Sequence, residues 1–263
     1  MNKFYKILKN IGKKMLIYTL LTMVVLVTLG YCCMEKMLFP APKSPSRCGN
    51  ITLVSGQFKL DALYVPPRDG QPTVLFSHGN GEVLAQLKNL ADEFQQRGYG
   101  FLTYDYAGYG ASEGQAGEKQ SYSDIKSAYD FLIGQANIPP EKIMVVGFSV
   151  GTGPSTYIAC TEKTGALVLA APFASAIEVM LPFPLPGNRF CTAERLSKNP
   201  VPVLIFHGTA DTIIPFRNAQ KIYRQAGGEK KLIAIPNADH AIINAAGEIF
   251  WQELANWASE YVK

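Results

Sequence analysis

The chain has 263 residues, 48% of them hydrophobic, which is enough to bury the core of one α/β domain. Its formal net charge is +4, but five lysines in the first 14 residues account for it, and the rest of the chain holds 20 basic and 21 acidic residues. A nucleic-acid-binding domain needs a basic face on its folded part, and this charge balance does not indicate one.

An uncharged stretch follows these lysines. Residues 15–34 hold no charged side chain, and a helix of about 20 residues spans the roughly 30 Å of a bilayer's hydrocarbon core. Glu35 and Lys36 come after it, so the positive-inside rule predicts a single-pass anchor with a cytoplasmic N-terminus. The remaining chain then lies on the extracytoplasmic or lumenal side. A cleaved signal peptide is the alternative, although its apolar region is usually shorter and no small-x-small site follows before Lys43.

These features divide the chain into a basic cytoplasmic flank (1–14), a transmembrane anchor (15–34), an extended tether with three prolines (35–49) and a folded domain (50–263). In that domain, short apolar segments alternate with segments of helical spacing. The predicted strands are 51–54, 58–65, 73–77, 99–104, the apolar run 143–146 before the Gly-x-Ser-x-Gly segment, 166–171, 201–206 and 231–235. The predicted helices are 83–97, 121–136, 150–160, 216–226 and a last one that ends at Tyr261. Asp61 and Ala62 interrupt the second strand and leave its length open.

This alternation predicts an α/β fold with a mostly parallel, doubly wound sheet. Residues 172–199 break the pattern, because Pro182, Pro184 and Pro186 stand there among apolar residues, and they predict a small lid. Ligands of such sheets bind beyond the carboxyl ends of the strands. Four polar loops fall at predicted strand ends, and they carry Asn80, Ser149, Asp211 and His240.

The loop at Ser149 has a pattern of its own. An apolar strand breaks into Gly147-Phe148-Ser149-Val150-Gly151, and helical spacing follows. Glycines on both sides of a serine allow a sharp strand-to-helix turn that exposes the hydroxyl, as a nucleophile requires. The alternative is that Ser149 only caps the helix. A serine nucleophile needs a base within hydrogen-bonding reach, and the chain offers three histidines for that role: His78, His207 and His240.

Ser149, Asp211 and His240 follow one another in the order typical of the α/β-hydrolase superfamily, which residues 50–263 resemble. Two further segments, 76–81 (Phe-Ser-His-Gly-Asn-Gly) and 105–114 (Asp-Tyr-Ala-Gly-Tyr-Gly-Ala-Ser-Glu-Gly), make the chain similar to the membrane-anchored abhydrolase-domain serine hydrolases. That group also has one N-terminal span and a minimal cap. One departure lies after His-Gly-Asn, where a small residue and a glycine are common and this chain continues with Gly81-Glu82-Val83.

The resemblance implies a role for each site residue. It makes Ser149 the nucleophile, His240 the general base and then acid, and Asp211 the group that orients His240. The backbone N–H groups of Asn80 and Val150 are expected to form the oxyanion hole. Substrate contacts are expected from Gly79, Phe148, Phe173 and Phe183.

Other acids and histidines have simpler expected roles. If Asp211 instead caps the following helix, Asp239 is the substitute that orients His240. His78 is expected to shape its loop, His207 to be a buried structural residue and Asp105 to tie down its glycine-rich loop. The five cysteines form no Cys-x-x-Cys pair and the three histidines are scattered, so no metal site is expected. The serine hydrolysis that the resemblance implies uses water as acceptor and no cofactor. A disulfide between Cys48 and Cys191 stays open.

The function expected from this resemblance is hydrolysis of carboxylic esters or thioesters, with an acyl-lipid type of substrate favoured by the apolar lid and the anchor. Two alternatives stay open: a serine peptidase of the prolyl-oligopeptidase-like type, and a catalytically inactive, membrane-tethered binding module. Lid residues contribute few acids, Glu178 and Glu194, so an acidic pocket for a peptide amine is not evident. The expected partners are a small acyl ester or lipid and the membrane itself, with the oligomeric state open.

Overall fold

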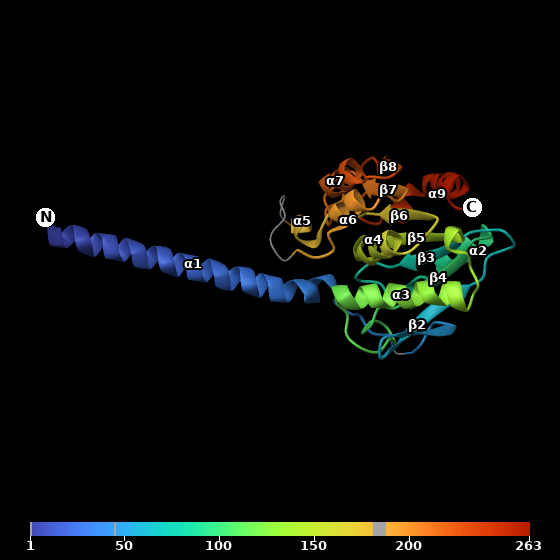
Figure 1. Ribbon diagram of the computed structural model, residues 1–263, viewed down its shortest axis with the longest axis horizontal. Coiled ribbons are helices and arrows are strands. Elements are labelled where there is room, and N and C mark those ends of the chain that lie inside the picture. Colours follow the sequence, from blue (N-terminus) through green and yellow to red (C-terminus); the bar gives the residue numbers. More distant parts are fainter. Residues whose placement is uncertain (1, 45, 181–187) are drawn as a thin grey trace. The chain divides into compact units, whose positions relative to one another are not determined.

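The computed structural model describes residues 2–44, 46–180 and 188–263, with the backbone alone at 2–4, 8, 26, 29–35 and 180. It divides into two units, Met1–Leu38 and Phe39–Lys263. The second unit holds the α/β domain, in which helices cover a central sheet (Figure 1).

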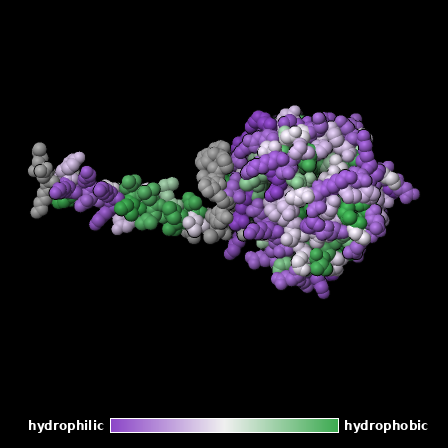
Figure 2. Space-filling view, in the orientation of Figure 1, coloured by the Kyte–Doolittle hydropathy of each residue, from purple (hydrophilic) through white to green (hydrophobic). Residues whose placement is uncertain are grey.

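The first unit is one helix, α1 (Asn2–Leu38), labelled in Figure 1. Apolar side chains in its middle part, such as Leu16, Leu20 and Val24, are exposed, and Figure 2 shows them as a hydrophobic band. The predicted span also includes side chains at 26 and 29–34, which lie outside the described residues. Within the part that is described, no helix is long and apolar enough to cross a membrane.

The predicted tether, 35–49, overlaps the end of helix α1. Helix α1 continues through the first residues of the segment 35–49 and ends at Leu38. The reason is local, because the residue before a proline is disfavoured in helical conformation and Pro40 is the first proline of the chain.

The second unit is built on an eight-stranded sheet with the order β1-β2-β4-β3-β5-β6-β7-β8. Its strands are β1 (Ile51–Ser55), β2 (Phe58–Val65), β3 (Thr73–Ser77), β4 (Gly100–Tyr104), β5 (Ile143–Phe148), β6 (Ala166–Ala170), β7 (Val203–Gly208) and β8 (Lys230–Ile235). β1 pairs with β2 and β2 with β4 in antiparallel fashion, and the other neighbours pair in parallel. The mostly parallel α/β-hydrolase sheet predicted from the sequence is therefore confirmed.

Helices cover both faces of this sheet. They are α2 (Lys88–Gln96), α3 (Glu118–Gly134), α4 (Thr152–Thr161), α5 (Ala176–Met180), α6 (Thr192–Lys198), α7 (Arg217–Gln225), α8 (Ile242–Ala246) and α9 (Glu248–Tyr261). One core joins α2, α8 and α9 to alternate strand residues such as Met144 and Val146. The residue between them, Val145, is equally buried but belongs to the other face, where α3, α4 and α7 pack. Continuous burial of this kind explains why the central strands read as unbroken apolar runs.

Strand β2 is continuous, although Asp61 stands in its middle. The Asp61 carboxylate is buried and accepts hydrogen bonds from the backbone N–H groups of Cys48 (2.7 Å) and Gly49 (3.2 Å) and from Nε of Arg47 (3.0 Å). These donors replace the water molecules that the carboxylate loses on burial, which allows an aspartate in the middle of β2.

The predicted lid, 172–199, is described at its two ends. Helices α5 and α6 lie there, and residues 181–187, which include the predicted substrate contact Phe183, lie outside the described residues. The lid ends are tied to α7, because Oδ1 of Asn218 accepts a hydrogen bond from the N–H of Ala174 and Lys221 forms an ion pair with Glu178. Cys48 and Cys191 are free thiols, so the disulfide between them is not formed.

Candidate active site

Ser149 lies where β5 turns into α4. Its φ is +53°, in the left-handed region that side chains other than glycine rarely adopt. A short 3₁₀ turn, Ser149–Gly151, joins the strand to the helix, and the serine is 7% exposed. Strained backbone of this kind persists where surrounding packing holds it, which is typical of functional sites.

The packing that holds the turn requires its glycines. A Cβ atom on Gly151 would lie 2.0 Å from the carbonyl oxygen of Ser77, at the end of the neighbouring strand β3. A Cβ atom on Gly147 would lie 2.6 Å from the carbonyl oxygen of Gly151. No side chain fits at either position. The sequence-based explanation of these two glycines, close strand-to-helix packing, is thus confirmed.

The loops that carry His240 and Asp211 meet the turn of Ser149. The Oγ atom of Ser149 lies 2.9 Å from Nε2 of His240, and Nδ1 of His240 lies 2.8 Å from Oδ2 of Asp211. An ionised carboxylate can only accept a hydrogen bond, so the proton of the neutral imidazole is on Nδ1 and Nε2 accepts from the serine hydroxyl. This tautomer is the one that a base for Ser149 needs.

Asp211 is held as an anion by several donors. Its Oδ1 accepts hydrogen bonds from the N–H groups of Ile213 and Ile214, at 2.9 and 2.8 Å. Burial alone would raise the pKa of Asp211, but hydrogen bonds from His207, His240 and the Ile214 N–H outweigh burial and hold that pKa well below its ordinary value. The carboxylate therefore orders its own turn and the imidazole of His240 at the same time.

The substitute acid has another position. Asp239 accepts hydrogen bonds from the backbone N–H and the hydroxyl of Thr212 and from the N–H of His240, and its carboxylate does not bond the imidazole of His240. The structure thus brings Asp211, rather than Asp239, to Nδ1 of His240.

His207 and His78 are both fully buried away from Ser149. Nε2 of His207 donates to the carbonyl oxygen of Ile214 at 2.8 Å, beneath Asp211. Nδ1 of His78 donates to the carbonyl oxygen of Gly79 at 2.8 Å. Burial lowers the pKa of His78 to about 4, against the opposing effect of the bond to Gly79, so this imidazole is neutral at neutral pH.

The loop that carries Asn80 is fixed by its neighbours. The Tyr109 hydroxyl donates to the carbonyl oxygen of Asn80 at 3.1 Å, and the Tyr106 hydroxyl donates to that of His78 at 2.8 Å. Oδ1 of Asp105 accepts the N–H of Leu84 at 2.7 Å, where the predicted helix 83–97 begins as a 3₁₀ turn before α2. The loop that the sequence placed after strand β3 is therefore anchored at both ends.

Glu82 also holds this loop, a role that the sequence does not predict. Its Oε2 accepts the N–H of Gly79 at 2.6 Å, and a Cβ atom on Gly79 would touch both this oxygen and the ring of Phe148 at 3.1 Å. The Phe148 ring in turn lies 5.3 Å from the ring of His240, centroid to centroid. The signal for Glu82 was the departure from the usual loop pattern at Gly81-Glu82-Val83.

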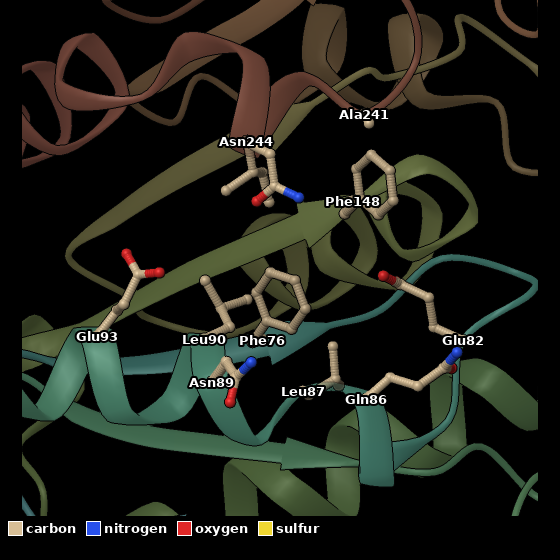
Figure 3. A pocket seen from close by; sticks show the side chains of 11 residues that line it. Phe76, Glu82, Gln86, Leu87, Asn89, Leu90, Glu93, Phe148, Ala241 and Asn244 are labelled. Carbon is tan, nitrogen blue, oxygen red and sulfur yellow. The ribbon is translucent and has the colours of Figure 1, made fainter.

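A cavity of about 320 Å³ opens beside these residues. Figure 3 shows the side chains around it, with Glu82 and Phe148 facing the same space and Glu93 farther along α2. The lining residues are Phe76, Glu82, Gln86, Leu87, Asn89, Leu90, Glu93, Phe148, Ala241, Ile243 and Asn244. Of the predicted substrate contacts, Phe148 lines this cavity. Phe173 is buried against Phe190 instead, with ring centroids 6.0 Å apart. Among the described residues, no group of three His, Cys, Asp or Glu side chains is placed to hold a metal ion.

Comparison with known proteins identifies the family to which this chain belongs. A family model described as serine aminopeptidase, S33 (Hydrolase_4) matches residues 69–190 and 189–246. The α/β-hydrolase domain-containing protein aho-3 of Caenorhabditis elegans is 35% identical over 177 residues, which are 64% of this chain and 52% of the nematode protein. The human α/β-hydrolase domain-containing protein 17B is 31% identical over 194 residues, or 72% of this chain and 66% of that protein. The match therefore spans between half and two thirds of these relatives.

Solved structures share the fold at lower identity. An esterase of Pyrococcus furiosus superposes with a TM-score of 0.68 and 17% identity, covering 86% of this chain and all of the esterase. Est1E of Butyrivibrio proteoclasticus, solved with ferulic acid bound, superposes with a TM-score of 0.65 and 18% identity, covering 80% of this chain and 99% of Est1E.

Proposed function

Because this chain is a serine hydrolase of the α/β-hydrolase family whose model is described as serine aminopeptidase, S33, we propose that it cleaves carboxylic esters or thioesters through an acyl-enzyme on Ser149. The observation that carries this proposal is the continuous chain of hydrogen bonds from Ser149 through His240 to Asp211, 2.9 and 2.8 Å long. A serine hydroxyl is a weak nucleophile, and this arrangement supplies the base and the anion that activate it.

In the first half of the reaction, Oγ of Ser149 attacks the carbonyl carbon of the substrate while its proton moves to Nε2 of His240. The imidazolium that results is stabilised by the Asp211 carboxylate. When the tetrahedral intermediate collapses, the bond to the leaving alkoxide or thiolate breaks, and Nε2 returns the proton to that leaving group. Water then attacks the acyl-enzyme by the same route, releases the acid and restores the serine.

The negative charge of the tetrahedral intermediate needs donors. We assign this role to the backbone N–H groups of Val150, next to the nucleophile in the tight turn, and of Asn80, in the loop held by Tyr109. No cofactor enters any of these steps.

An acyl-lipid type of substrate is the favoured class. The support is the apolar composition of the lid segment 172–199 and the uncharged stretch 15–34, preceded by five lysines. On this proposal the N-terminal helix is a single-pass anchor, with its N-terminus in the cytoplasm and the α/β domain on the extracytoplasmic or lumenal side. Alkaline carbonate extraction tests the anchor, because an integral protein stays in the membrane pellet and recovery in the soluble fraction would contradict it.

The proposed chemistry is tested on the full chain by labelling with a fluorophosphonate probe, which reacts with an activated serine. We expect labelling of the wild type and none of Ser149→Ala. A series of p-nitrophenyl acyl esters of increasing chain length, compared with aminoacyl-nitroanilides, then separates the esterase from the peptidase. Faster cleavage of the nitroanilides would favour the peptidase. A folded wild type that the probe does not label would favour the catalytically inactive binding module.

A further inference from the structure

We propose that Glu82 is a specificity-determining residue on the leaving-group side of the site, and that it favours ester or thioester substrates whose alcohol or thiol part carries an alkylammonium group. This inference rests on the proposed hydrolysis and adds the class of leaving group that the site prefers.

The first step concerns direction. In serine hydrolysis the imidazole gives its proton to the leaving group, so the leaving group must lie on the histidine side of the nucleophile. The cavity of about 320 Å³ begins at Phe148 and Ala241, the residues next to Ser149 and His240 in the chain. The ring of Phe148 also lies against that of His240, 5.3 Å apart. The cavity is therefore placed to receive the leaving group.

The second step concerns charge. No lysine or arginine lines this cavity, whereas Glu82 and Glu93 do. The two acids differ, because Arg97 lies 3.8 Å from the Glu93 carboxylate and balances it, while no cation among the described residues forms an ion pair with Glu82. The hydrogen bond that the Glu82 carboxylate accepts from the N–H of Gly79 fixes its position without neutralising it. Among the described residues, Glu82 is thus the carboxylate of this cavity without a lysine or arginine partner.

The third step concerns shape. The rings of Phe76 and Phe148 line the same space as Glu82 (Figure 3). Aromatic faces next to a carboxylate suit an alkylammonium group, because its methyl or methylene groups pack on the rings while its charge is attracted to both. A neutral leaving group of the same shape would keep the packing and lose the electrostatic attraction. The structure thus distinguishes two substrates that differ in charge alone.

The test compares butyrylcholine with 3,3-dimethylbutyl butyrate, in which a carbon atom replaces the charged nitrogen. Turnover of the neutral ester tests the proposed hydrolysis itself. The ratio of the two kcat/KM values, choline ester over neutral ester, tests the role of Glu82. We expect wild-type enzyme to prefer the choline ester by about tenfold, the order that a partly screened charge pair and a cation–π contact supply. That ratio should fall as salt is added.

Variants then assign the preference. Glu82→Gln keeps an acceptor for the Gly79 N–H and removes the charge, so the ratio should approach one. Asp92→Asn removes an exposed charge from helix α2, next to Glu93 in the chain but outside the cavity, and should leave the ratio at its wild-type value. Glu93→Gln should change it less than Glu82→Gln, because Arg97 already balances Glu93. Equal kcat/KM values in the wild type, or an unchanged ratio in Glu82→Gln, would overturn the inference.

A measurement on the wild type alone keeps the test independent of how the variants fold. Choline and 3,3-dimethylbutanol are compared as inhibitors of neutral-ester hydrolysis. Choline should inhibit at about tenfold lower concentration, for the same electrostatic reason. Equal inhibition by the two alcohols would also overturn the assignment, while hydrolysis of the neutral ester would still stand.

Discussion

His207 and Asp211 face each other inside the domain, with Nε2 of the histidine 3.4 Å from Oδ2 of the aspartate. The same Nε2 donates to the carbonyl oxygen of Ile214. Asp211 thus stands between two imidazoles, His240 on one side and His207 on the other. Its second oxygen accepts hydrogen bonds from two backbone N–H groups, so both oxygens of the carboxylate have donors.

This environment predicts the effect of Asp211→Asn. Asparagine can keep an oxygen for the two backbone N–H groups, but its NH₂ group then faces Nδ1–H of His240, and two donors oppose each other. The imidazole is expected to take the other tautomer, in which Nε2 cannot accept the serine proton. We expect kcat to fall about 10⁴-fold, and by roughly 10⁴–10⁶-fold in Ser149→Ala or His240→Ala. Steady-state ester hydrolysis measures this, and full turnover in folded Ser149→Ala would remove the mechanism.

A second prediction concerns the nucleophile turn. Gly151→Ala should lower the free energy of unfolding by about 3 kcal/mol or more, because its new methyl group meets the Ser77 carbonyl oxygen at 2.0 Å and backbone cannot yield as a side chain does. Gly134→Ala is the matched control. Nothing lies within 4 Å of a Cβ atom there, and it is the last residue of α3, so we expect no loss or a gain of up to about 1 kcal/mol. Urea unfolding measures both, and equal effects would contradict the packing argument.

A third prediction concerns the buried acid of β2. Asp61→Ala removes the acceptor of the Cys48 and Gly49 N–H groups and should cost about 3 kcal/mol of unfolding free energy. Arg47→Ala keeps the two backbone donors but removes the ion pair and an exposed hydrogen bond to the carbonyl oxygen of Ile51. Since the Arg47 side chain is half exposed, we expect a loss of less than about 1 kcal/mol. Thermal or urea unfolding compares the two. A larger loss in Arg47→Ala would show that the ion pair, rather than the backbone donors, stabilises this corner.

The fourth prediction concerns pH. Nε2 of His78 lies 3.6 Å from Oδ1 of Asp105. Burial lowers the pKa of His78 to about 4, and burial raises the pKa of Asp105 to about 6. Between pH 6.5 and about 4, His78 is protonated in the unfolded protein but not in the native one, so the free energy of unfolding falls as the pH drops. Over nearly the same range, Asp105 is protonated in the native protein but not in the unfolded one, so its contribution to the free energy of unfolding rises as the pH drops. The two effects oppose each other in the wild type.

Removing either partner should expose the effect of the other. Asp105→Asn keeps an oxygen for the Leu84 N–H, and its stability should fall, relative to wild type, by about 3 kcal/mol as pH drops from 6.5 to 4. His78→Gln should show the opposite trend and become relatively more stable between pH 6 and 4. Urea unfolding across this range measures both, and parallel curves for all three proteins would contradict the opposing shifts.

The sequence allowed the fold and the positions of the three loops to be predicted, because strand, turn and loop signals are local. The order of Ser149, Asp211 and His240 placed them at the same sheet edge. It could not show that Asp239 turns to Thr212, since that choice depends on the conformation of one loop. Nor could it show that Asp61 is stabilised within β2, because its hydrogen-bond donors belong to residues 47–49, which come close to Asp61 only in the folded domain.

The cavity was missed for a similar reason. The lid holds few acids, and those that line the cavity lie elsewhere in the chain: Glu82 belongs to the loop after β3 and Glu93 to α2. From the sequence alone, Glu93 is indistinguishable from the other charged residues on the solvent-facing side of this helix. Its lining role follows from α2 and α8 packing on the same face of the sheet, which a linear pattern does not reveal.

Strand β8 is the outermost strand of the sheet, paired with β7 alone, and the loop after it carries His240. A border strand can detach in a partial opening that costs less free energy than global unfolding. Such an opening would withdraw the imidazole and leave the serine turn intact in the centre. We therefore expect this protein to lose turnover under mild denaturant before its circular dichroism changes, so inactivation and melting should not coincide.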